Sequence, residues 1–176
     1  VLRYAAELML VAKQRGPILD LACGQGRNGL HLAQQGAPVV FADKDASALA
    51  GIQQQLTEES WDKQFCRCLQ VDLETGADAP LEHSAYSAIM VFRYLHRPLF
   101  DSIKRALAPG GLLVYETFTR DQAQYGRPKN PNFLLQAGEL QREFNSWIFL
   151  HSFEGTVQTR SGHTQAIAQL VAVKPQ

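Results

Sequence analysis

The stretch ILDLACGQGRNG, residues 18–29, decides the fold, because it joins an apolar run to an acid and then to a glycine-rich turn. A short apolar run that ends at such a turn is typical of a strand buried in a parallel sheet. Gly24, Gly26 and Gly29 form the pattern GxGxxG, in which glycine lets the backbone turn tightly and approach a ligand closely. The stretch predicts a strand, a nucleotide-binding turn and a helix, and by itself it leaves the nucleotide open.

Apolar runs and helical periodicity alternate along the whole chain. This alternation is typical of βα units, which build an α/β domain around a mostly parallel sheet. Strands are expected at residues 18–22, 38–42, 64–71, 86–92, 112–118, 147–153 and 163–173. Helices are expected at residues 1–14, after residue 27, around residues 49–56 and 100–107, and at about residues 138–145.

Local signals mark where several of these helices begin and end. Gly36 is a natural left-handed C-terminal cap for the helix that follows the glycine turn. Asp45 or Ser47 is suited to cap the start of the next helix.

The second half of the chain begins with another amphipathic segment. Phe100, Ile103 and Leu107 fall on one face of the predicted helix, and APGG at residues 108–111 is expected to end it. Residues 119–133 are rich in Gly, Pro and Asn, so they are expected to form a loop.

Length and composition favour one ordinary globular domain. The chain has 176 residues, of which 45% are hydrophobic and 19% charged, and it contains no apolar run long enough for a membrane span. Three cysteines make no disulfide framework, so a reducing, cytoplasmic environment is expected. Cys66 and Cys68 form a CxC without a second ligand pair, and we expect no metal site there.

The formal net charge is zero, which argues against a protein that grips nucleic acid by bulk electrostatics. The charge is unevenly distributed, however. Residues 93–129 contain seven bases against three acids, whereas residues 1–92 contain seven bases against eleven acids. The basic segment is either a solvated surface or an anion-binding patch.

Acids close the first three predicted strands, at the sheet edge where such folds bind ligands. Asp43 lies 19 residues after Gly24, a spacing suited to contacts with ribose hydroxyls. Asp20 discriminates between nucleotides, because a carboxylate at the turn suits a ligand with an amino group and a sulfonium and repels a pyrophosphate. Asp20 therefore favours a cationic ligand over a dinucleotide.

Four motifs in order make the chain resemble the class I S-adenosylmethionine-dependent methyltransferases. They are LDLACGQG, the acid that closes strand two, VDLETG after strand three, and LAPGGLLVYETF. The run from Asp20 to Leu49 and the segment AGELQREFNSW (137–147) resemble the tellurite-resistance group in particular, whereas residues 92–98 and 119–133 depart from it. The resemblance implies a Rossmann-like doubly wound, mostly parallel seven-stranded sheet of order 3-2-1-4-5-7-6 with the last strand antiparallel.

The same resemblance implies S-adenosylmethionine as cofactor and assigns its methionine end to the glycine turn. Gly24 and Gly26 would let the backbone approach this end, while Asp20 and Arg27 would fix its amino and carboxylate groups. The family usually has glycine where this chain has Ala22, whose methyl group fits if the backbone torsion is ordinary and crowds the ligand if it is not.

The adenosine end would be held at the next two strand ends. By resemblance, Asp43 would hold the ribose, Asp72 would bond the adenine amino group, and the backbone of Leu73 would bond the ring edge. Lys44 would lie along the adenine face.

The segment FRYLHRPLF, residues 92–100, follows strand four and is the richest in groups for an acceptor site. Phe92 and Arg93 would form a platform after the strand, as the resemblance implies. Arg93 or Arg97 is suited to hold an anionic acceptor.

Methyl transfer from a sulfonium is an in-line displacement, so alignment and exclusion of water are the main tasks of the protein. Where the acceptor carries a proton, His96, Tyr94 and Glu116 are the candidate catalytic residues. His96 and Glu116 are candidate bases, and Tyr94 offers a polar handle.

These observations lead to one main hypothesis and two alternatives. The main hypothesis is a single methyltransferase domain over residues 1–176 that acts on a small-molecule acceptor, with a helix at residues 1–16 over the site and a lid loop and short helix at residues 119–145. The first alternative is an NAD-dependent oxidoreductase that uses GxGxxG. The second is a cofactor-binding module without catalysis, or a subunit that methylates RNA or protein only with a partner, for which the basic segment is the best support.

Overall fold

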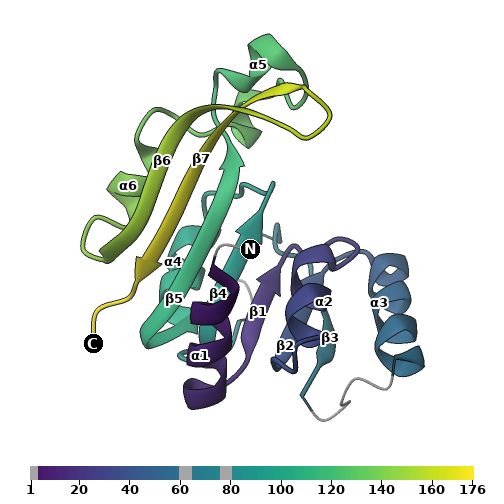
Figure 1. Cartoon of the computed structure of the whole chain (residues 1–176). Helices are drawn as coiled ribbons and strands as arrows, with labels where there is room; N and C mark the ends of the chain where they lie inside the picture. The colour runs from purple at the N-terminus through teal and green to yellow at the C-terminus, as the bar shows by residue number, and fades with distance from the viewer. Residues whose placement is uncertain (1–3, 60–64, 76–80) are drawn as a thin grey trace.

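The computed structural model describes residues 4–59, 65–75 and 81–176, and a sheet of seven strands lies at its centre (Figure 1). The strands are β1 (Ile18–Leu21), β2 (Val39–Asp43), β3 (Arg67–Gln70), β4 (Tyr86–Phe92), β5 (Leu107–Phe118), β6 (Ile148–Gln158) and β7 (Thr164–Val173). Their order is β3-β2-β1-β4-β5-β7-β6. The first five strands are parallel, and β7 is antiparallel to both β5 and β6. The predicted strand order and the antiparallel last strand are confirmed.

Helices cover both faces of this sheet (Figure 1). They are α1 (Ala5–Arg15), α2 (Arg27–Ala33), α3 (Ala46–Glu58), α4 (Leu99–Ala106), α5 (Gln122–Tyr125) and α6 (Glu139–Glu143), with a 3-10 turn at Pro131–Phe133. One apolar cluster joins α1, α2 and α3 to the sheet, and a second joins α4 and α6 to the opposite face. None of the helices in the described ranges has the length and apolar character needed to cross a membrane.

The alternation of side chains along β1 explains how an acid comes to lie inside the protein. Leu19 and Leu21 belong to the cluster on the α4 face, whereas Ile18 belongs to the cluster on the α2 face. Asp20 alternates with the two leucines and therefore faces α2, where it is almost fully buried. The one polar residue of the strand is thus aimed at the start of the following helix.

Two predicted helix boundaries are confirmed. The Asp45 side chain accepts hydrogen bonds from the backbone N–H groups of Ser47 and Ala48, at 2.9 and 3.2 Å, and so caps α3. Gly36 follows the end of α2 with φ +84°, the left-handed conformation expected there.

One predicted helix end is wrong. Helix α4 ends at Ala106, and Leu107 together with the APGG segment belongs to β5, where Leu107 pairs with Tyr86. The residue before a proline is disfavoured in helical conformation, which ends the helix ahead of Pro109. Leu107 is fully buried in this position, so its apolar character does not distinguish a helix face from a strand.

The ends of other elements also shift. The expected loop at residues 119–133 contains α5 and the 3-10 turn, and β6 is longer than expected. The described part of the third strand begins at Arg67, and residue 64, where it was expected to start, lies outside the described residues. Residues 1–3 of the expected first helix also lie outside them.

Candidate functional site

The turn after β1 is built from backbone in the left-handed region. Gly24 and Gly26 have φ of +53° and +71°, which glycine adopts without strain. Ala22 also has a positive φ, +53°, so its torsion is not the ordinary one that its methyl group requires. The backbone at Ala22 is therefore strained, whereas glycine would adopt this conformation without strain. Ala22 also lines two cavities at this edge of the sheet.

Asp20 lies beneath this turn and binds the next helix. Its Oδ2 atom accepts a hydrogen bond of 2.9 Å from the backbone N–H of Gly29. Among the described residues, the other oxygen, Oδ1, has no hydrogen-bond partner. Burial raises the pKa of Asp20 to about 7, against the lowering effect of the Gly29 hydrogen bond and with a further rise from the charge of Asp43.

The first and last glycines of GxGxxG, Gly24 and Gly29, have different structural roles. A Cβ atom on Gly24 would meet no atom of another described residue, beyond its chain neighbours, within 4 Å, so the space beside it is open there. A Cβ atom on Gly29 would lie 2.7 Å from Oδ2 of Asp20 and would also collide with Phe41. Gly24 thus leaves room for a ligand, whereas Gly29 allows α2 to approach the buried carboxylate.

Asp43 ties the end of β2 to the turn. Its Oδ2 atom accepts a hydrogen bond of 2.7 Å from the Gly24 N–H, and its Oδ1 atom accepts one of 3.0 Å from the Asp45 N–H. A carboxylate has about four acceptor positions, so these two bonds leave acceptor capacity at both oxygens.

A first cavity of about 220 Å³ opens at the ends of β1 to β4 and gathers most of the predicted cofactor residues. It is lined by Ala22, Gly24, Asp43, Lys44, Val71, Asp72, Leu73, Glu74, Phe92, Arg93 and Tyr94. Leu73 is buried, and Asp72 is exposed with its Oδ1 atom accepting a hydrogen bond of 2.9 Å from the Glu74 N–H. The topology therefore brings the predicted residues of four different strand ends into one cavity.

Glu74 is a residue of this cavity that the sequence analysis missed. The Tyr94 hydroxyl donates a hydrogen bond of 3.2 Å to Oε1 of Glu74, and Lys44 Nζ lies 3.7 Å from Oε2. Burial and the adjacent Glu74 carboxylate raise the pKa of Tyr94, which stays a neutral hydroxyl. The position of Glu74, two residues after Asp72 in VDLETG, was the available signal.

A second cavity of about 600 Å³ lies on the other side of the turn. It is lined by Asp20, Ala22, Cys23, Gln25, Arg27, Asn28, Phe92, Arg93 and Glu116. Arg27 is exposed at its rim, whereas Gly26 shapes the turn as the residue before α2. Burial and the charges of Asp20 and Asp43 raise the pKa of the Cys23 thiol, so this group stays protonated and packs beside the turn.

Arg93 and Glu116 both line this second cavity and are paired with each other. Arg93 has φ +58°, its N–H donates to the Glu116 carbonyl at 2.8 Å, and its guanidinium lies 3.0 Å from the Glu116 carboxylate. The guanidinium also lies over the Phe118 ring, 4.5 Å from its centre. Gln169 donates to Glu116 at 2.6 Å and contacts His151 at 3.1 Å, so Glu116 is held from two sides.

A third cavity of about 500 Å³ adjoins the first and is bounded by the loop after β5. It is lined by Glu74, Arg93, Tyr94, Leu95, Phe118, Arg127, Pro128 and Phe133. Three of these residues, Glu74, Arg93 and Tyr94, also line the first cavity. The two spaces therefore share one wall.

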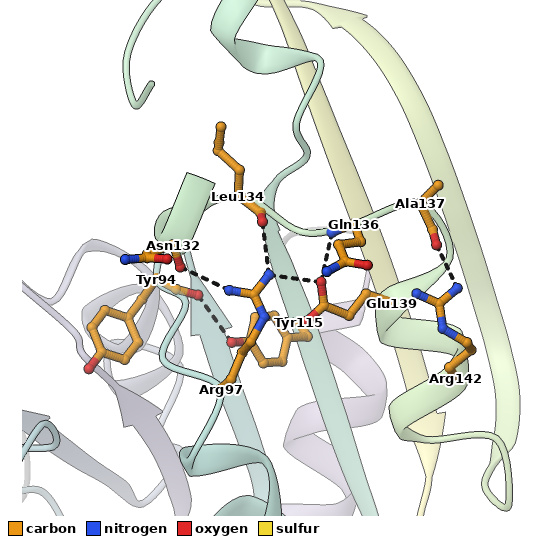
Figure 2. A network of polar contacts seen from close by, with 9 residues as sticks. All are labelled: Tyr94, Arg97, Tyr115, Asn132, Leu134, Gln136, Ala137, Glu139 and Arg142. Carbon is orange, nitrogen blue, oxygen red and sulfur yellow. Dashed lines mark hydrogen bonds and ion pairs between the residues drawn. The ribbon is translucent and has the colours of Figure 1, made fainter. Parts of the chain in front are cut away.

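Arg97 is one of the two residues that the sequence suggested for holding an anionic acceptor. In the structure its guanidinium is instead engaged by groups of the protein itself. Its guanidinium donates to both Glu139 oxygens at 2.6 and 2.9 Å, and to the backbone carbonyls of Asn132 and Leu134 at 3.1 and 3.0 Å (Figure 2). Glu139 is buried and also accepts from the Gln136 N–H at 2.7 Å. We call this set of contacts the Arg97 clasp.

The three candidate catalytic residues are placed differently. Tyr94 lines the first and third cavities, and Glu116 lines the second. His96 is half-buried and is not part of the lining of any of these three cavities. Two of the three therefore line cavities at this edge of the sheet, Tyr94 and Glu116 in different ones.

A family model places this chain in one family, and solved structures share its fold. Residues 18–111, slightly more than half of the chain, match the family model described as methyltransferase domain. No curated protein matches the sequence. Among solved structures, TehB from Haemophilus influenzae is similar with a TM-score of 0.75 and 22% identity, over 96% of this chain and 62% of TehB. The chain thus spans less than two thirds of the length of TehB.

Two further structures show how widely this fold is used. Geranyl diphosphate C-methyltransferase from Streptomyces coelicolor A3(2) has a TM-score of 0.68 and 19% identity, over 98% of this chain and 77% of its own. The [4+2]-cyclase SpnF has a TM-score of 0.73 and 17% identity, over 98% of this chain and 80% of its own. The fold alone therefore does not determine the reaction.

Proposed function

Because the chain belongs to the methyltransferase domain family of class I S-adenosylmethionine-dependent enzymes, we propose that it transfers the methyl group of this cofactor to a small-molecule acceptor. The observation that carries the proposal is the buried Asp20 carboxylate, which lines the second cavity and whose Oδ1 atom has no hydrogen-bond partner among the described residues. An ammonium group placed there would supply the missing partner. Cys23, Cys66 and Cys68 form no disulfide within the described residues, which fits a reducing, cytoplasmic setting.

The cofactor spans the first two cavities in this proposal. Asp20 and Arg27 hold its amino and carboxylate groups beside the open face of Gly24. Asp43 uses its remaining acceptor capacity for the ribose hydroxyls. Around the adenosine end lie Lys44, Asp72, Leu73, Phe92 and Arg93.

The chemical step is a displacement at the methyl carbon. A lone pair of the acceptor atom forms the new bond to carbon as the carbon–sulfur bond breaks, and its electron pair stays on sulfur to give a neutral thioether. Where the acceptor carries a proton, that proton leaves to Glu116, to water or to another base. Tyr94 lines the cavity next to the cofactor and orients the acceptor. We rank His96 below Tyr94 and Glu116 as a candidate catalytic residue, because it is half-buried and lines none of the three cavities.

Charge pairing supports a small-molecule acceptor over a nucleic acid. Three bases of the basic segment are engaged within the protein: Arg93 with Glu116, Arg97 with Glu139, and Lys104 with Asp101 and Glu143. The local excess of positive charge is therefore smaller at the surface than the sequence suggests.

Titration calorimetry with S-adenosylhomocysteine tests the cofactor site. We expect micromolar binding that is lost in Asp43→Ala and weakened at least tenfold in Asp20→Asn, because each variant removes a charged acceptor. Asp121→Asn is the matched control, since Asp121 is exposed on the loop and its side chain makes no cap contact. Absence of any binding, or displacement of S-adenosylhomocysteine by NAD, contradicts the proposal.

A further inference from the structure

We propose that the third cavity selects an acceptor with an apolar body and a single carboxylate, which Arg127 binds. This inference rests on the proposed function, because the third cavity is taken as the acceptor site of the same enzyme. It goes beyond that function in assigning the chemical class of the acceptor.

The cavity is suited to an apolar body. Leu95, Phe118, Pro128 and Phe133 contribute apolar and aromatic surface, and the volume of about 500 Å³ is in the range of small-molecule sites. Phe133 is half exposed, so it leaves a large apolar side chain open at the cavity wall. A ligand that covers these side chains gains hydrophobic free energy.

The charges around the cavity leave one cation uncompensated. Arg93 is paired with Glu116, and Glu74 is paired with Lys44 and bonded to Tyr94. The Arg127 guanidinium has no ion-pair or hydrogen-bond partner within residues 4–59, 65–75 and 81–176. The surplus is therefore one positive charge.

A single carboxylate matches this surplus better than a phosphate does. A phosphate monoester carries about −1.5 to −2 charges at pH 7, and a diphosphate carries more. The excess negative charge would lie in a cavity that already contains Glu74 and adjoins Glu116. A planar carboxylate also fits the paired donors of a guanidinium.

The backbone at Arg127 is held in place before any acceptor arrives, and its exposed side chain extends from this fixed point. Its backbone carbonyl accepts a hydrogen bond of 3.2 Å from Gln122, whose Oε1 atom in turn accepts from the Ala166 N–H at 2.9 Å. The Arg97 clasp fixes the other end of the loop at Asn132 and Leu134 (Figure 2). The cavity wall is thus preorganised, which lowers the entropic cost of binding.

The lining also orients the acceptor. Arg93 and Tyr94 border both the first and the third cavity, whereas Arg127 borders only the third. A carboxylate on Arg127 therefore lies on the side away from the cofactor. The atom that receives the methyl group is at the other end of the acceptor.

Binding measurements on protein saturated with S-adenosylhomocysteine test this assignment without requiring turnover. Cinnamate and indole-3-acetate are compared by calorimetry with their primary amides and with phenyl phosphate. We expect at least one carboxylate to bind about tenfold more tightly than its amide and more tightly than phenyl phosphate. In Arg127→Gln, we expect this preference to fall to about one while S-adenosylhomocysteine binds as in the wild type.

Lys129→Gln is the control, because Lys129 is an exposed base of the same loop that does not line the cavity. It should keep the preference for the carboxylate. The inference is overturned if no probe binds, if amide or phosphate binds as well as carboxylate, or if Arg127→Gln keeps the preference. Failure of S-adenosylhomocysteine itself to bind would instead overturn the proposed function.

Discussion

Asp20 at the end of β1 and Gly29 in the first turn of α2 are joined by a hydrogen bond of 2.9 Å from the Gly29 N–H to Oδ2 of Asp20. This bond engages one carboxylate oxygen in the fold and leaves the other without a protein partner in the described part of the chain. The same side chain therefore serves the structure and, in the proposed function, the ligand. The ionisation of Asp20 therefore makes both the stability of the fold and the affinity for the ligand depend on pH.

Cofactor affinity should depend on pH through Asp20. Burial raises the pKa of Asp20 to about 7 in the free protein, so a proton must leave this carboxyl before it can bind an ammonium group below that pH. We expect the dissociation constant of S-adenosylhomocysteine to be about tenfold higher at pH 6 than at pH 8. Calorimetry across this range measures it, and Asp20→Asn should show a flat profile.

Asp20 should also make the free protein less stable at neutral and alkaline pH. Its folded-state pKa is raised from 3.8 to about 7, so the stabilising protonated form is fully present below pH 3.8 and is lost as pH rises through about 7. We expect Asp20→Asn to raise the free energy of unfolding by about 2–4 kcal/mol at pH 8. Urea denaturation at pH 8 and pH 4 checks this, since the gain should largely vanish at pH 4.

Ala22→Gly should stabilise the protein. Ala22 holds φ +53°, and removing its Cβ relieves the strain of a left-handed conformation, which is worth about 1 kcal/mol after the greater freedom of glycine in the unfolded chain is subtracted. Chemical denaturation measures the gain. Ala50→Gly in the exposed part of α3 is the control and should lose about 1 kcal/mol. A loss of stability in Ala22→Gly would refute the strained torsion.

Two glycine-to-alanine changes in helices should have opposite signs. Gly29→Ala places a Cβ against Asp20 and Phe41 and should destabilise the fold by about 1–3 kcal/mol. Gly51→Ala in α3 places a Cβ in open space and should stabilise it by about 0.5–1 kcal/mol. Thermal denaturation of the two variants compares them directly, and equal shifts would count against the close approach of α2 to Asp20.

The Arg97 clasp should hold the loop after β5 in place. Arg97→Met leaves the buried Glu139 without its cation and should lower the free energy of unfolding by about 1–3 kcal/mol, because Arg97 itself is partly exposed. Limited proteolysis should cut residues 119–133 faster in this variant than in the wild type. Lys104→Met, which removes two ion pairs with the partly or fully exposed Asp101 and Glu143, should show the wild-type rate.

The sheet and its ligand-binding edge could be predicted because they depend on local patterns. The alternating apolar runs and the glycine turn predict the strands, and the family resemblance that these motifs carry implies the strand order. The acids at strand ends place Asp43 and Asp72 at one edge of the sheet. The end of α4 could not be predicted in the same way, because Leu107 is apolar and buried in either conformation. The hydrophobic pattern indicates which residues are buried, but it does not distinguish the last residue of a helix from the first residue of a strand.

Side-chain pairing across long stretches of sequence was also out of reach. Arg97 and Glu139 are 42 residues apart, and nothing in either local segment indicates that they meet. Glu74 and Arg127 come from loops after different strands and contribute to one cavity only because the sheet brings those loops together. Of the two residues suited to hold an anionic acceptor, Arg93 and Arg97, the sequence could not show that Arg97 is engaged by Glu139.

The first and third cavities share three lining residues, so the same side chains border both spaces. Glu74, Arg93 and Tyr94 cannot adjust to an occupant on one side without altering the fit on the other. By thermodynamic reciprocity, each occupant then changes the affinity of its neighbour by the same factor. In the proposed function, this shared wall would make the binding of cofactor and the binding of acceptor depend on each other before the methyl group is transferred.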